Sequence, residues 1–239
     1  MTTTQLRTAI TGLLAFAAAE EETIFAAAVR GDSGGPRRWL AVPTLAHITE
    51  FKSQQSQRAM AILSGRTPPA FGEIDHTAES VYTAYATRPA EEVLSESRQV
   101  TASLIDAVRA LADEDLLDPS RHSWLRGRTL WLQIIVRGFW HPTGHLADYY
   151  LQHDQPERAV ALQSHALATA RYLHAPDQAT GMAAYGLACA QATSGLGEDA
   201  ARALSEAITL NPDVRANAAR DADLASLRDS GQLDRILAV

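Results

Sequence analysis

Two histidines in the stretch FWHPTGHLADYY, His141 and His145, stand four residues apart. On a helix this spacing places two imidazoles on one face, one turn apart, where they can share a metal ion. Proline and glycine cost a helix interior about 3 and 1 kcal/mol relative to alanine, so Pro142 and Gly144 are unusual in a helix that serves only to pack. The alternative for such a pair is one hydrogen-bonded core histidine and one histidine beside a kink.

A third candidate ligand is His47, in the segment PTLAHITEF. It shares a predicted helix with Ile48 and Phe51, whose apolar side chains indicate a buried face. Helices of a bundle bring such residues together in the core, and three neutral imidazoles around one divalent metal leave a coordination position open. The residues therefore make His47 a candidate third ligand for a metal shared with His141 and His145.

Two carboxylates stand close to these histidines in the sequence. Glu50 follows His47 by three residues, and Asp148 follows His145 by three residues. Each could orient a ligand imidazole or act as a general base, and both are therefore candidate catalytic residues facing the same cavity. A solvated surface carboxylate is the equally weighted alternative for each.

Other reactive residues show no comparable pattern. Five histidines stand near predicted loops or helix ends and are expected to be exposed: His76, His122, His153, His165 and His174. Cys189, the only cysteine, is expected to be a small buried thiol, and it excludes an internal disulfide. The sequence contains no recognisable Ser/His/Asp arrangement and no phosphate-binding glycine loop.

The elements that position these residues are predicted to be helices, because helical periodicity dominates the sequence and indicates an all-α fold. Four long helices joined by loops form a four-helix bundle within residues 1–152, with a short helix before the third. Their expected ranges are Thr4–Val29, Pro43 to Gly65, Ile74–Thr87 for the short helix, Ala90–Ala112 and Thr129–Gln152. The segment GDSGGP, Gly31–Pro36, is expected to end the first helix.

Residues 153–239 differ in composition, being rich in alanine and poor in large aromatic residues. A shift of 41 residues aligns four features, namely Leu146–Ala147 with Leu187–Ala188, Asp154 with Gly195, Ala159 with Ala200 and Ala166 with Ala207. The second copy, with the segment that follows it, resembles a tetratricopeptide repeat (TPR) and its capping helices over about Arg158 to Val239. A plain helical hairpin that braces the bundle is the alternative.

Charge and hydropathy limit the functional class. The net charge is −7, with 28 acidic and 21 basic residues, and Lys52 is the only lysine, so a nucleic-acid-binding surface is not expected. The apolar N-terminal stretch is followed by Glu20, Glu21 and Glu22, which favours a soluble helix over a signal peptide. With no other stretch approaching the ~20 apolar residues that span a bilayer, we expect no membrane association and a cytoplasmic location.

Two stretches together resemble a known family. Trp39–Phe51 contains a tryptophan followed by L-x-H-I-x-E-F, and Trp140–Tyr150 contains the H-x-x-x-H pair. This combination is similar to the DinB/YfiT-like superfamily of metal-binding four-helix bundles, closest to its ClbS/DfsB branch. The similarity extends over about Leu6 to Leu151. It implies a divalent metal, zinc or nickel, held by His47, His141 and His145, and Pro142 and Gly144 depart from the residues more usual at these positions.

The resemblance also implies a class of reaction. Members include thiol S-transferases, a thiol-dependent isomerase and a hydrolase that disarms a reactive toxin. We therefore expect a metal-dependent enzyme that adds water or a low-molecular-weight thiol to a small electrophile, in detoxification or self-resistance. The alternative is a non-catalytic protein that sequesters a ligand or binds a protein partner through the repeat-like region. Bundles of this kind often pair, so a homodimer is compatible with the sequence.

Overall fold

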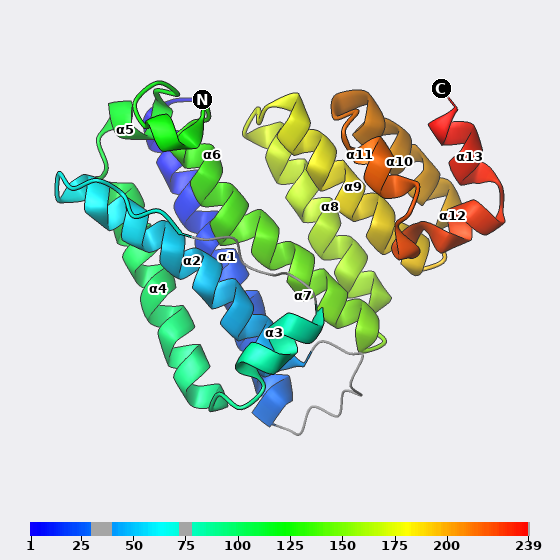
Figure 1. The fold of residues 1–239 in the computed structure, drawn as a ribbon, viewed down its shortest axis with the longest axis horizontal. Coiled ribbons are helices and arrows are strands. Elements are labelled where there is room, and N and C mark those ends of the chain that lie inside the picture. Colours follow the sequence, from blue (N-terminus) through cyan, green and yellow to red (C-terminus); the bar gives the residue numbers. More distant parts are fainter. Residues whose placement is uncertain (30–39, 72–77, 239) are drawn as a thin grey trace. The chain divides into compact units, whose positions relative to one another are not determined.

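The computed structural model describes residues 1–29, 40–71 and 78–238. Every regular element in these ranges is a helix, which confirms the all-α prediction (Figure 1). The chain divides into two compact units, Met1–Tyr149 and Tyr150–Val239, and the division lies within the helix α7 (His141–Gln152). Of the helices described, none is both long enough and apolar enough to cross a membrane.

The first unit contains long helices close to the predicted ranges. The elements are α1 (Thr3–Val29), α2 (Ala41–Leu63), α3 (Ala78–Tyr85), α4 (Ala90–Ala110), α5 (Asp113–Leu117), η1 (Ser123–Leu125), α6 (Leu130–Ile135), η2 (Val136–Trp140) and α7 (His141–Gln152). The short helix α5 was not predicted from the sequence. The predicted loop Gly31–Pro36 and the predicted start of the short helix at Ile74 lie outside the described residues.

Helix α2 lies at the centre of this unit. It packs against α1, α3, α4 and η2, and α1 also packs against α4, α6 and η2. Figure 1 shows α1, α2 and α4 as neighbouring long helices. The apolar positions that suggested helices are buried at these contacts, including Ile10, Leu45, Ile48 and Leu104, each with no exposed surface.

A buried ion pair joins three of these helices. Lys52 on α2 donates from Nζ to both carboxylate oxygens of Glu21 on α1, at 2.9 and 2.7 Å, and both side chains are 1% exposed. The same ammonium donates to Ser97 Oγ and Thr101 Oγ1 on α4, at 3.0 and 2.9 Å. Four acceptor contacts replace the water lost on burial, so this network fixes how α1, α2 and α4 meet.

A π-helical turn interrupts the segment predicted as one helix over Thr129–Gln152. The five residues of η2 separate α6 from α7, and Pro142 follows directly in the first turn of α7. Proline lacks an amide hydrogen, and in an α-helix its ring crowds the carbonyl group four residues earlier. A π turn is wider, because its hydrogen bonds join residues five apart, and it leaves room for the proline ring. The turn explains how the helix continues through Pro142. Gly144 meets no neighbouring atom within 4 Å of its would-be Cβ.

The second unit is a series of helices, three of them long. They are α8 (Pro156–Tyr172), α9 (Asp177–Thr193), α10 (Gly197–Leu210), α11 (Val214–Ala218), η3 (Ala222–Leu224), α12 (Ala225–Asp229) and α13 (Gln232–Leu237). Helix α9 packs against both α8 and α10, and the short C-terminal helices cover α9 and α10. The turn after α7 passes through Asp154 at φ 58°, and the turn after α9 passes through Gly195 at φ 78°. The two positions aligned by the 41-residue shift thus share the left-handed conformation.

Close packing of α9 against α10 depends on a residue without a side chain. A Cβ on Gly181 would lie 2.6 Å from Asn211 Cβ and 3.0 Å from the backbone oxygen of Ala207. We expect the overpacking in Gly181→Ala to lower the free energy of unfolding by roughly 1–3 kcal/mol. The higher helix propensity of alanine offsets up to about 1 kcal/mol of this loss. Urea denaturation of the full chain measures the difference.

Gly186, on the same helix, is the matched control. Its Cβ would meet first the Oε1 atom of Gln163 at 2.7 Å, the end of a flexible side chain that can move away. Gly186→Ala should therefore leave stability unchanged or raise it by up to about 1 kcal/mol through the same gain in helix propensity. Equal losses for the two substitutions would show that the clash at Gly181 is not the cause.

Candidate metal centre

The three predicted ligands come together in the first unit. His47 projects from α2 with no exposed surface, and His141 and His145 project from the first turns of α7. The ring centroids of His47 lie 5.1 Å from His141 and 4.6 Å from His145, and those of His141 and His145 are 4.5 Å apart. Three imidazoles from two helices thus meet at one point.

Their nitrogen atoms have the spacing that one metal ion requires. The candidate ligand atoms, one from each histidine, all lie within 4.8 Å of one another. Nε2 of His141 and Nε2 of His145 are 3.1 Å apart. Two nitrogens bound at 2.0–2.1 Å to one tetrahedral zinc lie roughly 3.4 Å apart, so this donor set fits a divalent metal. No carboxylate belongs to the group.

An aromatic ring covers one side of the centre. The ring of Phe51, one turn after His47 on α2, lies 4.2 Å from the ring of His141 and 5.0 Å from that of His47 between centroids. Phe51 is 2% exposed. The ring of Phe51 also contacts the guanidinium group of Arg137 on η2, whose carbon lies 4.5 Å from the ring centroid. Phe51 therefore keeps water from one flank of the histidines and separates them from a cation.

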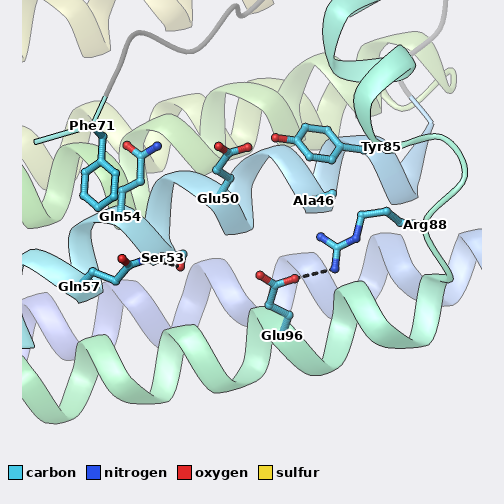
Figure 2. A pocket seen from close by; sticks show the side chains of 9 residues that line it. All are labelled: Ala46, Glu50, Ser53, Gln54, Gln57, Phe71, Tyr85, Arg88 and Glu96. Atoms are coloured by element: carbon cyan, nitrogen blue, oxygen red, sulfur yellow. Dashed lines mark hydrogen bonds and ion pairs between the residues drawn. The ribbon is translucent and has the colours of Figure 1, made fainter. Parts of the chain in front are cut away.

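A cavity of about 270 Å³ lies along the adjoining face of α2. It is lined by Ala46, Glu50, Ser53, Gln54, Gln57, Phe71, Tyr85, Arg88 and Glu96. Figure 2 shows the Glu50 carboxylate and the Tyr85 hydroxyl directed toward one another across it, and an ion pair of 2.7 Å between Arg88 and Glu96 on its wall. The three histidines are not among the residues that line this cavity, although two lining residues, Ala46 and Glu50, are close to His47 in the sequence of α2.

The two predicted catalytic carboxylates differ in position. Glu50 lines the cavity, where burial and the nearby charge of Glu96 raise the pKa of its carboxyl above the ordinary value of 4.5. Asp148 is half-buried on α7 and is not among the residues that line the cavity. That Glu50 and Asp148 both face one cavity with the histidines stays a prediction.

Removing the charge of Glu50 should stabilise the protein in a pH-dependent way. Because the pKa of Glu50 is raised in the folded state, ionisation of its carboxyl destabilises the folded state. Below the ordinary pKa of 4.5 this destabilisation is absent, and it grows as the pH rises through the folded-state pKa. We expect Glu50→Gln to gain less than about 1 kcal/mol at neutral pH, since solvent screens a half-exposed group. The gain should disappear near about pH 4.

Urea denaturation at both pH values measures this effect, with Glu91→Gln, an exposed residue on α4, as the control. An equal gain at both pH values would mean that packing, and not charge, is responsible.

The remaining histidines are only partly as expected. His165 and His174 are exposed, whereas the side chain of His122 is only 10% exposed and its Nε2 lies 3.6 Å from Asp115. The prediction that His122 is exposed was wrong, because α5 supplies a neighbour that the sequence did not show. His153 is half-buried, and His76 lies outside the described residues.

A second group of potential ligands surrounds Cys189 in the other unit. Its Sγ lies 3.8 Å from Asp221 Oδ2, and Asp223 completes the group. Asp221 already accepts hydrogen bonds from the hydroxyl of Tyr185, at 2.5 Å, and from the amide of Asp223, at 3.0 Å. Burial and the bond to Asp221 raise the pKa of Tyr185. These contacts attach η3 to α9, which is a structural role.

Sequence reasoning missed the residues that the cavity draws from beyond α2. Tyr85 and Arg88 come from α3 and the turn that follows it, and Glu96 comes from α4. None has a reactive partner at short spacing, so only tertiary packing brings them to Glu50. Comparison of the whole chain with protein-family models, with curated proteins and with solved structures gave no match, so the geometry of the site carries the functional argument.

Proposed function

We propose that the protein is a metal-dependent enzyme that adds water or a small thiol to a reactive electrophile, with His47, His141 and His145 holding one zinc or nickel ion. The observation that carries the proposal is the convergence of three imidazoles from α2 and α7, with ligand atoms within 4.8 Å of one another. Three neutral ligands leave the positive charge of the ion uncompensated and one coordination position open.

The chemistry follows from this donor set. A divalent metal bound there supplies Lewis acidity, which makes a water or a thiol a stronger nucleophile at neutral pH. Phe51 excludes water from the flank of His141 that it covers. Glu50 stands on the adjoining face of α2, and its raised pKa makes the ionised carboxylate a better proton acceptor than an ordinary one. Glu50 is therefore our candidate general base, and Asp148 our candidate for orienting His145.

We further propose that the first unit is a four-helix bundle of the DinB/YfiT-like kind, closest to the ClbS/DfsB branch. Support comes from the packing of α1, α2 and α4 with one another and of α1 and α2 with η2, and from ligands on α2 and α7. The second unit would be a TPR-like hairpin with capping helices, supported by the left-handed turn residues Asp154 and Gly195. The single cysteine suits the cytoplasm.

A second candidate function is protein binding through the second unit, without catalysis. Three large apolar side chains there are exposed, namely Tyr172 at 65%, Met182 at 51% and Leu196 at 43%. Exposed apolar residues on a helical-hairpin unit suit a partner helix or an extended peptide. Turnover separates the two candidates, because a binding protein would consume no electrophile.

The test is a screen of zinc- and nickel-loaded full-length protein against small electrophiles such as epoxides and activated alkenes. Water alone and a low-molecular-weight thiol are supplied in turn as the nucleophile. We expect metal-dependent consumption of at least one electrophile class, lost in His141→Ala and retained in His165→Ala. A protein that binds the metal tightly but never exceeds the rate of His141→Ala would contradict the enzymatic proposal.

A further inference from the structure

Three arginines lie near enough for their charges to interact: Arg58 on α2, Arg137 on η2 and Arg128 just before α6. The pKa of Arg137 is lowered mainly by burial, and the positive charges of Arg58 and Arg128 lower it further. Burial also lowers the pKa of Arg58. Arg58 and Arg137 are half-buried and Arg128 is exposed, so the cluster reaches solvent while its inner members are partly desolvated. Like charges held together in this way repel one another.

Aromatic rings hold two of the guanidinium groups in place. The guanidinium carbon of Arg58 lies 4.9 Å from the ring centroids of both Phe71 and Trp124. That of Arg137 lies 4.5 Å from the ring centroid of Phe51. Ring faces attract cations and orient their planes, but they carry no net charge. These rings therefore position the positive charge of the cluster and do not themselves neutralise it.

No carboxylate in the described part of the chain forms an ion pair with this cluster. The side-chain hydrogen bond of Arg58 goes to the backbone oxygen of Pro69, and that of Arg128 goes to the backbone oxygen of Leu125, each at 3.3 Å. Arginines elsewhere in the unit, such as Arg7 and Arg98, do form ion pairs. A cluster that has no counter-ion among the described residues and offers several N–H donors is suited to an oxyanion.

The cluster and the histidines lie along one seam between two helical segments. On α2, His47, Phe51 and Arg58 are spaced by four and seven residues, which places them on one face. On the other segment, Arg137 precedes His141 by four residues. Phe51 contacts both Arg137 and His141, so the ring of one side chain adjoins a guanidinium of the cluster and a candidate metal ligand. At 1.5 Å per residue, His47 and Arg58 are ~16 Å apart along α2, and the arginine side chain shortens that span.

We propose that Arg58, Arg128 and Arg137 bind an oxyanion group, a carboxylate or a phosphate, of the small molecule on which the histidine centre acts. The anion site itself stands on the arginine geometry, whereas its link to the reacting molecule rests on the proposed function. The guanidinium groups fix one end of that molecule and leave its electrophilic end toward the histidines. The expected substrate class is thus a small anionic electrophile and not a neutral one.

Binding is tested with benzoate and inorganic phosphate as probes and neutral benzamide as the uncharged analogue of benzoate. Binding is measured by calorimetric titration of the full-length protein, which is first treated with a chelator to remove any metal. We expect saturable binding of at least one anion that weakens as salt is added, and no binding of benzamide. The stronger of the two anions identifies the group as a carboxylate or a phosphate.

Variants locate the bound anion. Arg58→Gln and Arg137→Gln should each weaken anion binding at least roughly 10-fold, because each removes a charged donor. Arg66→Gln, exposed just beyond α2 in the same unit, is the matched control and should bind normally. If Arg137→Gln fails to fold, Arg137→Lys keeps the charge without the planar fork and should still weaken binding. Benzamide binding as tightly as benzoate, or unchanged affinity in the folded variants, would overturn the inference.

The link to catalysis is tested separately. A carboxylate-bearing electrophile should have a lower KM than its amide analogue, and Arg137→Gln should raise the KM of the former and leave that of the latter unchanged. Anion binding in a protein that binds neither zinc nor nickel would refute the proposed function and leave the anion site standing. Metal binding and turnover without anion binding would refute this inference alone.

Discussion

Zinc or nickel, added at about 1,000 times its dissociation constant, should stabilise the protein by roughly 4 kcal/mol, because a ligand that binds only the folded state shifts unfolding by mass action. For a chain of this size that corresponds to a rise in Tm of roughly 8–16 °C. His47→Ala, His141→Ala and His145→Ala should each abolish most of the rise. The three donor atoms lie within 4.8 Å of one another, and two neutral ligands hold a divalent ion poorly.

Thermal denaturation with and without metal, with metal content measured on protein purified without a histidine tag, tests this prediction. His165→Ala, exposed on α8, is the control and should respond to metal as the wild type does. Circular dichroism should show nearly unchanged helical content in all variants, because the helix contacts remain. If the wild type and the variants all contain negligible metal, and the three histidine variants are less stable than the wild type, the three residues are ordinary core histidines.

Lys52→Met should lower the free energy of unfolding by about 3–5 kcal/mol, because it leaves the carboxylate of Glu21 buried without its partner. Both side chains are 1% exposed, and the ammonium also donates to Ser97 and Thr101. The methionine fills most of the lysine volume, so the loss reports the charge and not a cavity. Urea denaturation of the full chain measures it.

Two controls separate burial from pairing. The double variant Glu21→Leu/Lys52→Met should recover most of the lost stability, since apolar residues replace both charges together. Glu22, the next residue on α1, pairs with Arg98 on α4, but these side chains are 40% and 61% exposed. Arg98→Met should therefore cost much less than Lys52→Met, because water screens the pair. Equal losses for the two single variants would contradict the role of burial.

The sequence alone determined the helices and the residues that face inward on them. Periodic apolar positions predicted α1, α2, α4 and the last long helix of the first unit, because burial of one helix face leaves a period of 3.6 residues in the sequence. The four-residue spacing of His141 and His145 placed both on one face of a helix for the same reason. His47 was added because its apolar neighbours indicated a buried position.

The tertiary structure decided what meets these residues. The π turn before Pro142 was not visible in the pattern; it contains Arg137, which contacts Phe51, and leads directly into the helix on which His141 and His145 meet His47. Periodicity specifies which face of a helix is buried but not its partner. Packing therefore placed Glu50 beside Glu96 and Tyr85, and gathered three arginines from separate elements, since long-range contacts of single polar residues leave no repeating signal in the chain.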